Sequence, residues 1–264
     1  MHDTPDEAPR EAARLLADSW LAGRRIDDLP RPLRPSTRAQ GYAIQALWPA
    51  AIGHEIGGWK IAATSQAGQR HIGVTGPLAG PVFRHRVRGD GAELSLRSNG
   101  MRVAECEIVF RLGRPLAPRA AGHARDAVLA AVESIHAGIE VPDSRFARFE
   151  QAGEAQLIAD CACSHDMVIG AAVRPDGRLE QLAGLAVHAA VSDGRSADGE
   201  GRNVLGDPVE ALVWLVNELG AHGRTLQPGQ FVTTGACVAP IPVQPGHRVE
   251  ADFGWIGRLG VRFT

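Results

Sequence analysis

VAECEIVF, residues 103–110, is the stretch of this 264-residue chain from which its fold and its site are best read. Side chains alternate between the two faces of a β-strand, so one face of this segment is wholly apolar: Ala104, Cys106, Ile108 and Phe110. The opposite face places two carboxylates, Glu105 and Glu107, between valines. The segment therefore predicts a strand with one face in a core and two acidic groups on the other.

The paired carboxylates indicate a metal site. The Cβ atoms of Glu105 and Glu107 are expected ~7 Å apart, because a strand rises ~3.3 Å per residue. A hard divalent cation, Mg²⁺ or Mn²⁺, relieves the repulsion between such groups and prefers carboxylate oxygens. The alternative is a solvated strand face, on which glutamates need no partner.

Glu140 supplies a third carboxylate. It lies between Ile139 and Val141, and a charge inside a short apolar strand is costly unless it is paired or ligates a metal. Three carboxylates can hold one face of an octahedron and leave the other face for substrate and water. The alternatives are a glutamate in water at a strand edge, or an ion pair with Arg145.

The basic residues single out one further side chain. Of the 28 basic residues, 27 are arginine and one, Lys60, is lysine. A bias of this kind replaces surface lysines freely, so a lysine that persists is a candidate for chemistry that a guanidinium cannot perform. The alternative is a stray surface lysine.

Polar residues near these positions could bind or turn over a polar ligand. Thr64, Ser65 and Gln69 follow the lysine and offer hydroxyl and amide groups, although the same residue types also make ordinary turns. Asp143 and Arg145 follow the third glutamate in a turn, and Arg145 could grip a carboxylate.

The front of the chain predicts a small helical lobe. Residues 8–22 carry apolar side chains at helical spacing, and Ser36 can cap a second helix that ends before Pro49. A proline-rich connector, residues 29–35, separates the two helices. We expect residues 1–56 to form this lobe.

Two helices are predicted later in the chain. Residues 123–137 show an apolar face and are followed by Gly138, which predicts a helix stopped by glycine and then a short strand at 139–142. Residues 208–222 form the clearest helix, with Asp207 as its N-cap.

The remainder from residue 57 onward reads as β-structure, in short segments separated by glycine and proline. This mixture predicts an α+β fold dominated by a mixed sheet or roll, with residues 57–264 as the catalytic domain.

Composition excludes several classes of function. The net charge of −2 makes nucleic acid an improbable partner, and no apolar run approaches the ~18 residues of a membrane span. The polar, acidic N-terminus lacks the apolar region of a secretory signal. The four cysteines form no CxxC pair, which favours reduced thiols in a cytoplasm.

Motifs for other chemistries are missing from the sequence. None of the ten histidines shows HxxxH or HxH spacing, which disfavours zinc. There is no GxGxxG after a strand, no P-loop and no GxSxG elbow, which argues against nucleotide-binding proteins and serine hydrolases.

Six segments, taken in order, resemble the 2-keto-4-pentenoate hydratase family. They are GWKIAATSQAGQRHIGV, VAECEIVFRLGRPL, GIEVPDSRF, IADCACSHDMVIG, GDPVEALVWLVNELGAHG and FVTTGACVAPIPVQPG. This family includes the hydratases and oxalocrotonate decarboxylases of aromatic meta-cleavage pathways, within the fumarylacetoacetate hydrolase superfamily. The likeness covers roughly residues 10–264.

The resemblance implies a mixed β-roll and a Mg²⁺ or Mn²⁺ site that acts on a small 2-keto or 2-enol carboxylic acid. The family's metal-binding carboxylates fall on Glu105, Glu107 and Glu140, and its active-site lysine on Lys60. Its Thr-Ser pair falls on Thr64 and Ser65, and its Thr-Gly on Thr234 and Gly235. A cytoplasmic homo-oligomer is expected.

Two segments depart from the family pattern. Arg84 and His85 stand where many hydratases carry an acidic residue, and the usual Ala-Asp-Asn reads Ala159-Asp160-Cys161. Hydration of a 2-hydroxy-2,4-dienoate to a 4-hydroxy-2-keto acid is the first expectation. The alternatives are decarboxylation of an oxalocrotonate-type acid, then hydrolysis of an acylpyruvate, or a non-catalytic partner subunit.

Overall fold

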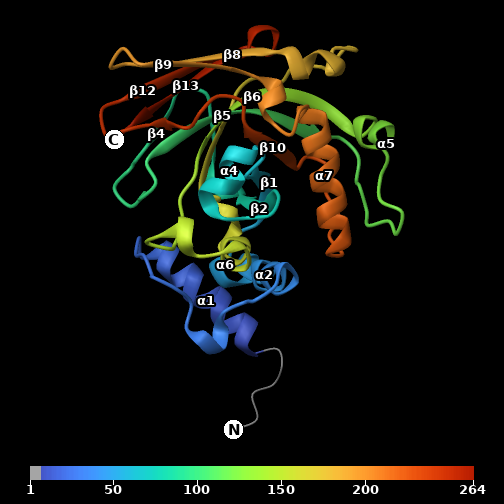
Figure 1. Ribbon diagram of the computed structural model, residues 1–264. Coiled ribbons are helices and arrows are strands. Elements are labelled where there is room, and N and C mark those ends of the chain that lie inside the picture. Colours follow the sequence, from blue (N-terminus) through green and yellow to red (C-terminus); the bar gives the residue numbers. More distant parts are fainter. Residues whose placement is uncertain (1–6) are drawn as a thin grey trace.

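A computed structural model describes residues 7–264 as two sheets with helices packed at one end and along one side (Figure 1). The larger, eight-stranded sheet has the order β2-β1-β10-β5-β6-β7-β3, with β11 paired to β5. Its strands are β1 Ile56–Ala62, β2 Leu78–Phe83, β3 Val87–Gly89, β5 Val103–Leu112, β6 Val132–Val141, β7 Asp166–Ile169, β10 Phe231–Ala236 and β11 Ile241–Pro242. Two of the pairings, β1 with β10 and β3 with β7, are parallel, so the sheet is mixed as predicted.

The larger sheet is curled into a roll. Its two outermost strands, β2 and β3, are joined by one short 3₁₀ segment, Arg84–Arg86, so the ends of the sheet lie near each other. Gly57 marks the seam, because a Cβ there would lie 3.1 Å from the Cα of Arg84 and 3.5 Å from Val87 Cγ2.

An apolar plug fills part of the inside of this roll. Five buried side chains from four strands form a cluster separate from the main core: Val82, Val109, Met167, Ile169 and Phe231. Gly138 makes room for the plug, because a Cβ there would collide with Met167 Cε and lie 2.6 Å from Val109 Cγ2. Val109 follows Glu107 on the same face of β5, so the plug lies directly behind the carboxylates.

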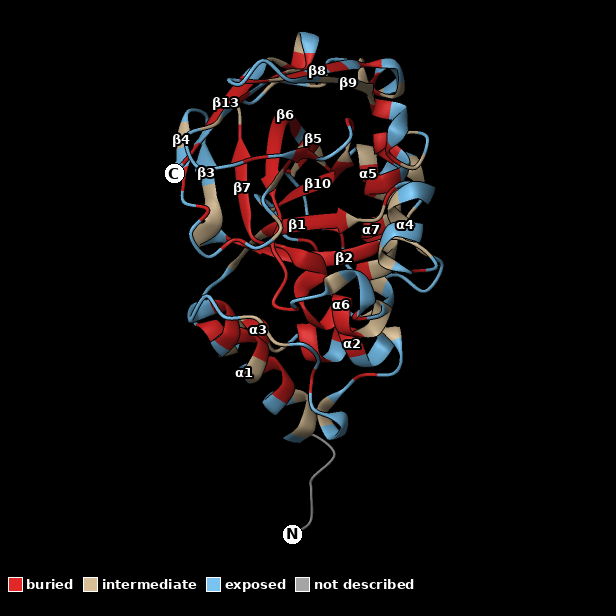
Figure 2. Ribbon diagram, turned by 60° about the vertical axis from the view of Figure 1, so that its left-hand side comes forward, coloured by how far each residue is buried: buried red, intermediate tan, exposed pale blue. Residues whose placement is uncertain are grey.

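The smaller sheet has five strands in the order β4-β13-β12-β8-β9 and packs against β6 from outside the roll. Its strands are β4 Ala92–Leu94, β8 Ala186–Val191, β9 Ser196–Glu200, β12 Arg248–Asp252 and β13 Arg258–Phe263. The main core extends through both sheets and the helices, and Figure 2 shows the strands of the roll as largely buried.

The helices are α1 Glu7–Leu21, α2 Arg38–Gln45, α3 Trp48–Ile52, α4 Gln66–Ile72, α5 Arg125–Leu129, α6 Glu154–Ala159 and α7 Pro208–Ala221. The predicted helices at 8–22 and 208–222 are confirmed, and Asp207 caps α7 by accepting a hydrogen bond from Val209 N. The predicted cap at Ser36 is wrong. Thr37 caps α2 instead, by accepting from Gln40 N.

The first three helices form one group with α6, which comes from a hundred residues later (Figure 1). Gln45 of α2 donates to the carbonyls of Ala79 and Ile158, and Trp48 of α3 donates to Ala159 O. The predicted boundary after residue 56 falls at the start of β1. The division into two domains stays a prediction, and residues 1–6 of the predicted lobe lie outside the described part.

The prediction of a helix over 123–137 is wrong. Only α5, Arg125–Leu129, is helical, and β6 then runs without interruption from Val132 to Val141. Gly138 therefore stops no helix but lies inside a strand, opposite Glu107.

In the described part of the chain, helices are too short or too polar to cross a bilayer. All four cysteines are buried free thiols, as predicted.

Candidate metal centre inside the roll

Three carboxylates converge inside the roll. Glu105 of β5 is the register partner of Glu140 of β6, and Glu107 stands two residues farther along β5 on the same face. Each residue offers a carboxylate oxygen, and the three oxygens lie within 4.8 Å of one another. Glu105 is half-buried, whereas Glu107 and Glu140 are fully enclosed, so Glu105 is the member of the cluster nearest to solvent.

The hydrogen bonds of Glu107 leave one oxygen free. Its Oε2 accepts from the Thr233 hydroxyl and from the backbone N–H of Gly235 at 2.7 Å. Its Oε1 is buried and has no hydrogen-bond partner among residues 7–264. The donors thus fix the carboxylate and direct its unused oxygen into the cluster.

Glu140 is still less satisfied. Neither of its oxygens makes a hydrogen bond within the described residues, and its nearest cation is Lys60, whose Nζ lies 3.3 Å from Oε2. Buried polar atoms normally find partners, so these three buried carboxylate oxygens, one of Glu107 and two of Glu140, require an explanation. The donor set fits a hard divalent cation.

The pKa values of the three carboxyl groups are all raised. Burial, and then the neighbouring Glu105, raises the pKa of Glu107 to about 7. Burial also raises the pKa of Glu105, and it raises that of Glu140 well above its usual range. The charged forms are therefore unstable together until a cation joins them.

Lys60 lies beside the cluster, on the inward face of β1. It is 3% exposed, and its ammonium donates to the carbonyl of Ala162 at 3.1 Å. Burial alone would lower the pKa of Lys60, but the carboxylates of Glu140, Glu105 and Glu107 outweigh burial and raise it. The only lysine of the chain is thus a buried, protonated group at the site.

Thr64 and Gly235 pack against each other next to Glu107. A Cβ on Gly235 would collide with Thr64 Oγ1 and lie 2.7 Å from its Cγ2, and Gly235 has a φ of +103°, which glycine adopts freely. Ser65 and Gln69 have local roles. Ser65 caps α4 by accepting from Gly68 N, and Gln69 donates to Ala63 O at 3.1 Å.

Thr233 is a site residue that the sequence analysis missed. Its neighbour Thr234, which was predicted instead, donates to the carbonyl of Ile108 within the sheet. Alternation along β10 places Thr233 on the same face as the predicted Gly235, and this signal could have identified it. In the sheet, Thr233 pairs with Lys60 on one side and with Val109 on the other.

The two predicted turn residues, Asp143 and Arg145, are buried and have partners outside the carboxylate cluster. Arg145 has no solvent exposure, forms an ion pair with Asp160, and donates to Ser164 O at 3.0 Å. Asp143 accepts from Gly100 N at 2.9 Å and forms an ion pair with Arg25. These contacts differ from the expected roles in catalysis and carboxylate binding, and they exclude the suggested pairing of Arg145 with Glu140.

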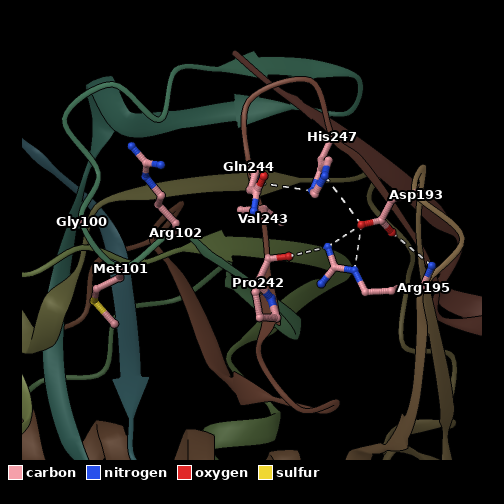
Figure 3. A pocket seen from close by; sticks show the side chains of 9 residues that line it. All are labelled: Gly100, Met101, Arg102, Asp193, Arg195, Pro242, Val243, Gln244 and His247. Atoms are coloured by element: carbon pink, nitrogen blue, oxygen red, sulfur yellow. Dashed lines mark hydrogen bonds and ion pairs between the residues drawn. The ribbon is translucent and has the colours of Figure 1, made fainter.

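A separate surface hollow of about 560 Å³ lies beside the loop that leads into β5 (Figure 3). Its charged groups are engaged mainly with one another, because Arg195 binds both Asp193 and the carbonyl of Pro242, and His247 lies 3.6 Å from Asp193. None of the predicted site residues lines this hollow.

Comparison with known sequences identifies the fold. Residues 77–264 match the family described as fumarylacetoacetate (FAA) hydrolase C-terminal. The chain belongs to the fumarylacetoacetate hydrolase family. Within this family, the chain is 30% identical to the "2-keto-4-pentenoate hydratase 2" of Dechloromonas aromatica strain RCB, over 97% of this chain and 98% of that one.

A second curated sequence and a solved structure are also similar to this chain over most or all of its length. The "2-hydroxyhexa-2,4-dienoate hydratase" of Comamonas testosteroni is 31% identical over 81% of this chain and 80% of its own. Among solved structures, "4-oxalocrotonate decarboxylase from Pseudomonas putida G7 - complexed with magnesium and adipate" superposes with a TM-score of 0.88 and 25% identity, over 100% of both chains. The predicted α+β roll and the predicted family are thereby confirmed.

Proposed function

We propose that this protein is a hydratase that requires Mg²⁺ or Mn²⁺ and adds water to a 2-hydroxy-2,4-dienoate, giving a 4-hydroxy-2-keto acid. The convergence of Glu105, Glu107 and Glu140 with orphan buried oxygens carries this proposal. The full-length similarity to a 2-keto-4-pentenoate hydratase supports the class of substrate. A cytoplasmic location and a homo-oligomeric state stay predictions that accompany it.

Each part of the site has a task in this reaction. Glu105, Glu107 and Glu140 would hold a divalent cation, which would supply Lewis acidity to stabilise negative charge on the substrate oxygens. Thr233 and Gly235 keep the Glu107 carboxylate in place, so that no reorganisation is needed when the acid binds.

Lys60 acts as a cation and a hydrogen-bond donor, because the carboxylates of Glu140, Glu105 and Glu107 raise the pKa of its ammonium. An ammonium has three hydrogens, of which one is taken by Ala162 O and one faces Glu140. The third is left for the carboxylate or the C2 oxygen of the substrate.

The direct test is turnover of 2-hydroxypenta-2,4-dienoate with Mg²⁺, with Mn²⁺ and with a chelator, with the product identified by mass. We expect a product heavier by one water, formed only with metal. Consumption that continues undiminished in chelator would contradict the role given to the carboxylates.

Decarboxylation of a 4-oxalocrotonate-type acid is the second candidate, because the solved decarboxylase superposes over the whole chain. The same carboxylates and Lys60 would then stabilise the enolate that remains when CO₂ leaves. Release of CO₂ from 2-oxohex-3-enedioate, with no addition of water to the shorter dienoate, would favour this reaction over hydration.

A further inference from the structure

An unusual backbone segment lies against the site. Cys161, Ala162 and Cys163 all have positive φ, at 55°, 52° and 61°, and none of them is glycine. A left-handed conformation costs an L-residue about 1–2 kcal/mol, so three in succession persist only where the surrounding structure holds them. All three are buried, and we call this segment the left-handed turn.

The left-handed turn rests on β2 at a glycine. A Cβ on Gly80 would collide with the carbonyl oxygen of Cys161 and lie 2.7 Å from its carbonyl carbon. Gly80 is also the register partner of Lys60 across β1 and β2. The glycine therefore brings the turn to the sheet directly beside the lysine.

At this place the turn presents one acceptor to the lysine. The carbonyl of Ala162 accepts from Lys60 Nζ at 3.1 Å, and the same Nζ lies 3.3 Å from Glu140 Oε2. Three carboxylates attract the same ammonium, as the raised pKa of Lys60 records. Without the carbonyl, nothing described on the turn side would keep the ammonium from moving onto the oxygens of Glu105 and Glu107.

We propose that the left-handed turn is the positioning element for Lys60: its Ala162 carbonyl holds the ammonium at the margin of the cluster, and Gly80 is the residue that admits the turn. The ammonium then serves the substrate and does not compete with the cation for carboxylate oxygens. This inference rests on the proposed metal site. Gly80 and Ala162 are positioning residues, since they act through Lys60.

The test is a double-mutant cycle read out by Mn²⁺ affinity. Gly80→Ala introduces the Cβ that displaces the turn, and Gly89→Ala is the matched control, because a Cβ there meets no atom within 4 Å. We expect Gly80→Ala to weaken Mn²⁺ binding about tenfold, within the range of coupling found between residues in contact. In a Lys60→Met background the same substitution should change the affinity by less than about twofold.

The single lysine offers a second readout, whose first measurement is made on the wild type alone. Protein grown with ¹⁵N-labelled lysine gives one side-chain ammonium signal, because Lys60 is the only lysine. In the metal-free wild type we expect this signal to exchange slowly with water, and in Gly80→Ala to shift and exchange faster. The wild-type measurement still tests the proposal if Gly80→Ala does not fold.

The outcomes separate the two hypotheses. If Gly80→Ala loses as much Mn²⁺ affinity in the Lys60→Met background as in the wild type, or if the wild-type lysine signal exchanges rapidly, the positioning role is overturned. Absence of Mn²⁺ binding by the wild type together with a slowly exchanging lysine would overturn the proposed metal site, and leave the contact between turn and lysine intact.

Discussion

Replacing Glu107 with glutamine should make the metal-free protein more stable and the enzyme inactive. Glutamine has the shape of glutamate without its charge. Its carbonyl can accept from Thr233 and Gly235, as the Oε2 of Glu107 does. Its NH₂ group would then point into the cluster, where Glu140 has two oxygens that accept no hydrogen bond within residues 7–264.

The size of the gain follows from the pKa of Glu107, which rises from 4.5 to about 7 in the folded chain. A carboxyl with a raised folded pKa loses stability as pH rises from the unfolded value through the folded one. Above pH 7 the shift corresponds to a cost of about 3 kcal/mol. The variant avoids this cost, so it should gain up to about 3 kcal/mol at pH 8 and nearly nothing at pH 4.

Chemical denaturation in the presence of chelator, at pH 4 and pH 8, measures this gain. Mn²⁺ titration and turnover of the dienoate measure the accompanying loss, which we expect to exceed about a hundredfold in affinity. Glu133→Gln is the matched control, because Glu133 is an exposed glutamate of β6, the strand that pairs with β5.

Two results would refute the reasoning. Wild-type turnover by Glu107→Gln would remove this residue from the metal site. If metal-free Glu107→Gln has a lower free energy of unfolding than Glu133→Gln at pH 8, the charge of Glu107 does not destabilise the fold in the way that its burial implies.

Two further outcomes follow from the site. Protons compete with metal for carboxylates whose pKa is raised, so Mn²⁺ affinity should rise with pH through about 7, by up to about tenfold per pH unit for each proton displaced. Calorimetry in buffers of different ionisation enthalpy counts the displaced protons. An Mn²⁺ affinity that does not change between pH 5.5 and 8 would contradict this expectation. Arg145→Ala should lower the free energy of unfolding by about 3–5 kcal/mol, because it leaves Asp160 buried without its partner, while the folded fraction keeps its KM. Unchanged thermal stability with a raised KM would instead place Arg145 at the substrate.

Local patterns in the sequence predict the part of the site that depends on strand geometry. Alternation along β5 is enough to place Glu105 and Glu107 on one face. The apolar neighbours of Glu140 mark it as a charge that needs a partner. The single lysine stands out by composition alone, and the structure places it 3.3 Å from Glu140.

The sequence-based predictions fail where contacts between residues far apart in the chain determine the local structure. The sequence of 123–137 fits a helical period, yet its last part, from Val132 onward, is strand because β6 pairs with both β5 and β7. Gly138 reads as a helix stop, although its missing side chain serves to admit Met167. Arg145 reads as a turn residue that could grip a carboxylate, because no local pattern in the sequence predicts its buried ion pair with Asp160.

Along β5, the apolar plug follows Glu107 on the side opposite to Glu105. Because Glu105 is the half-buried member of the cluster, we expect substrate, water and product all to approach from its side. Product would then inhibit by direct competition with substrate, and a substituent at the distal end of the substrate would extend toward solvent and not toward the plug.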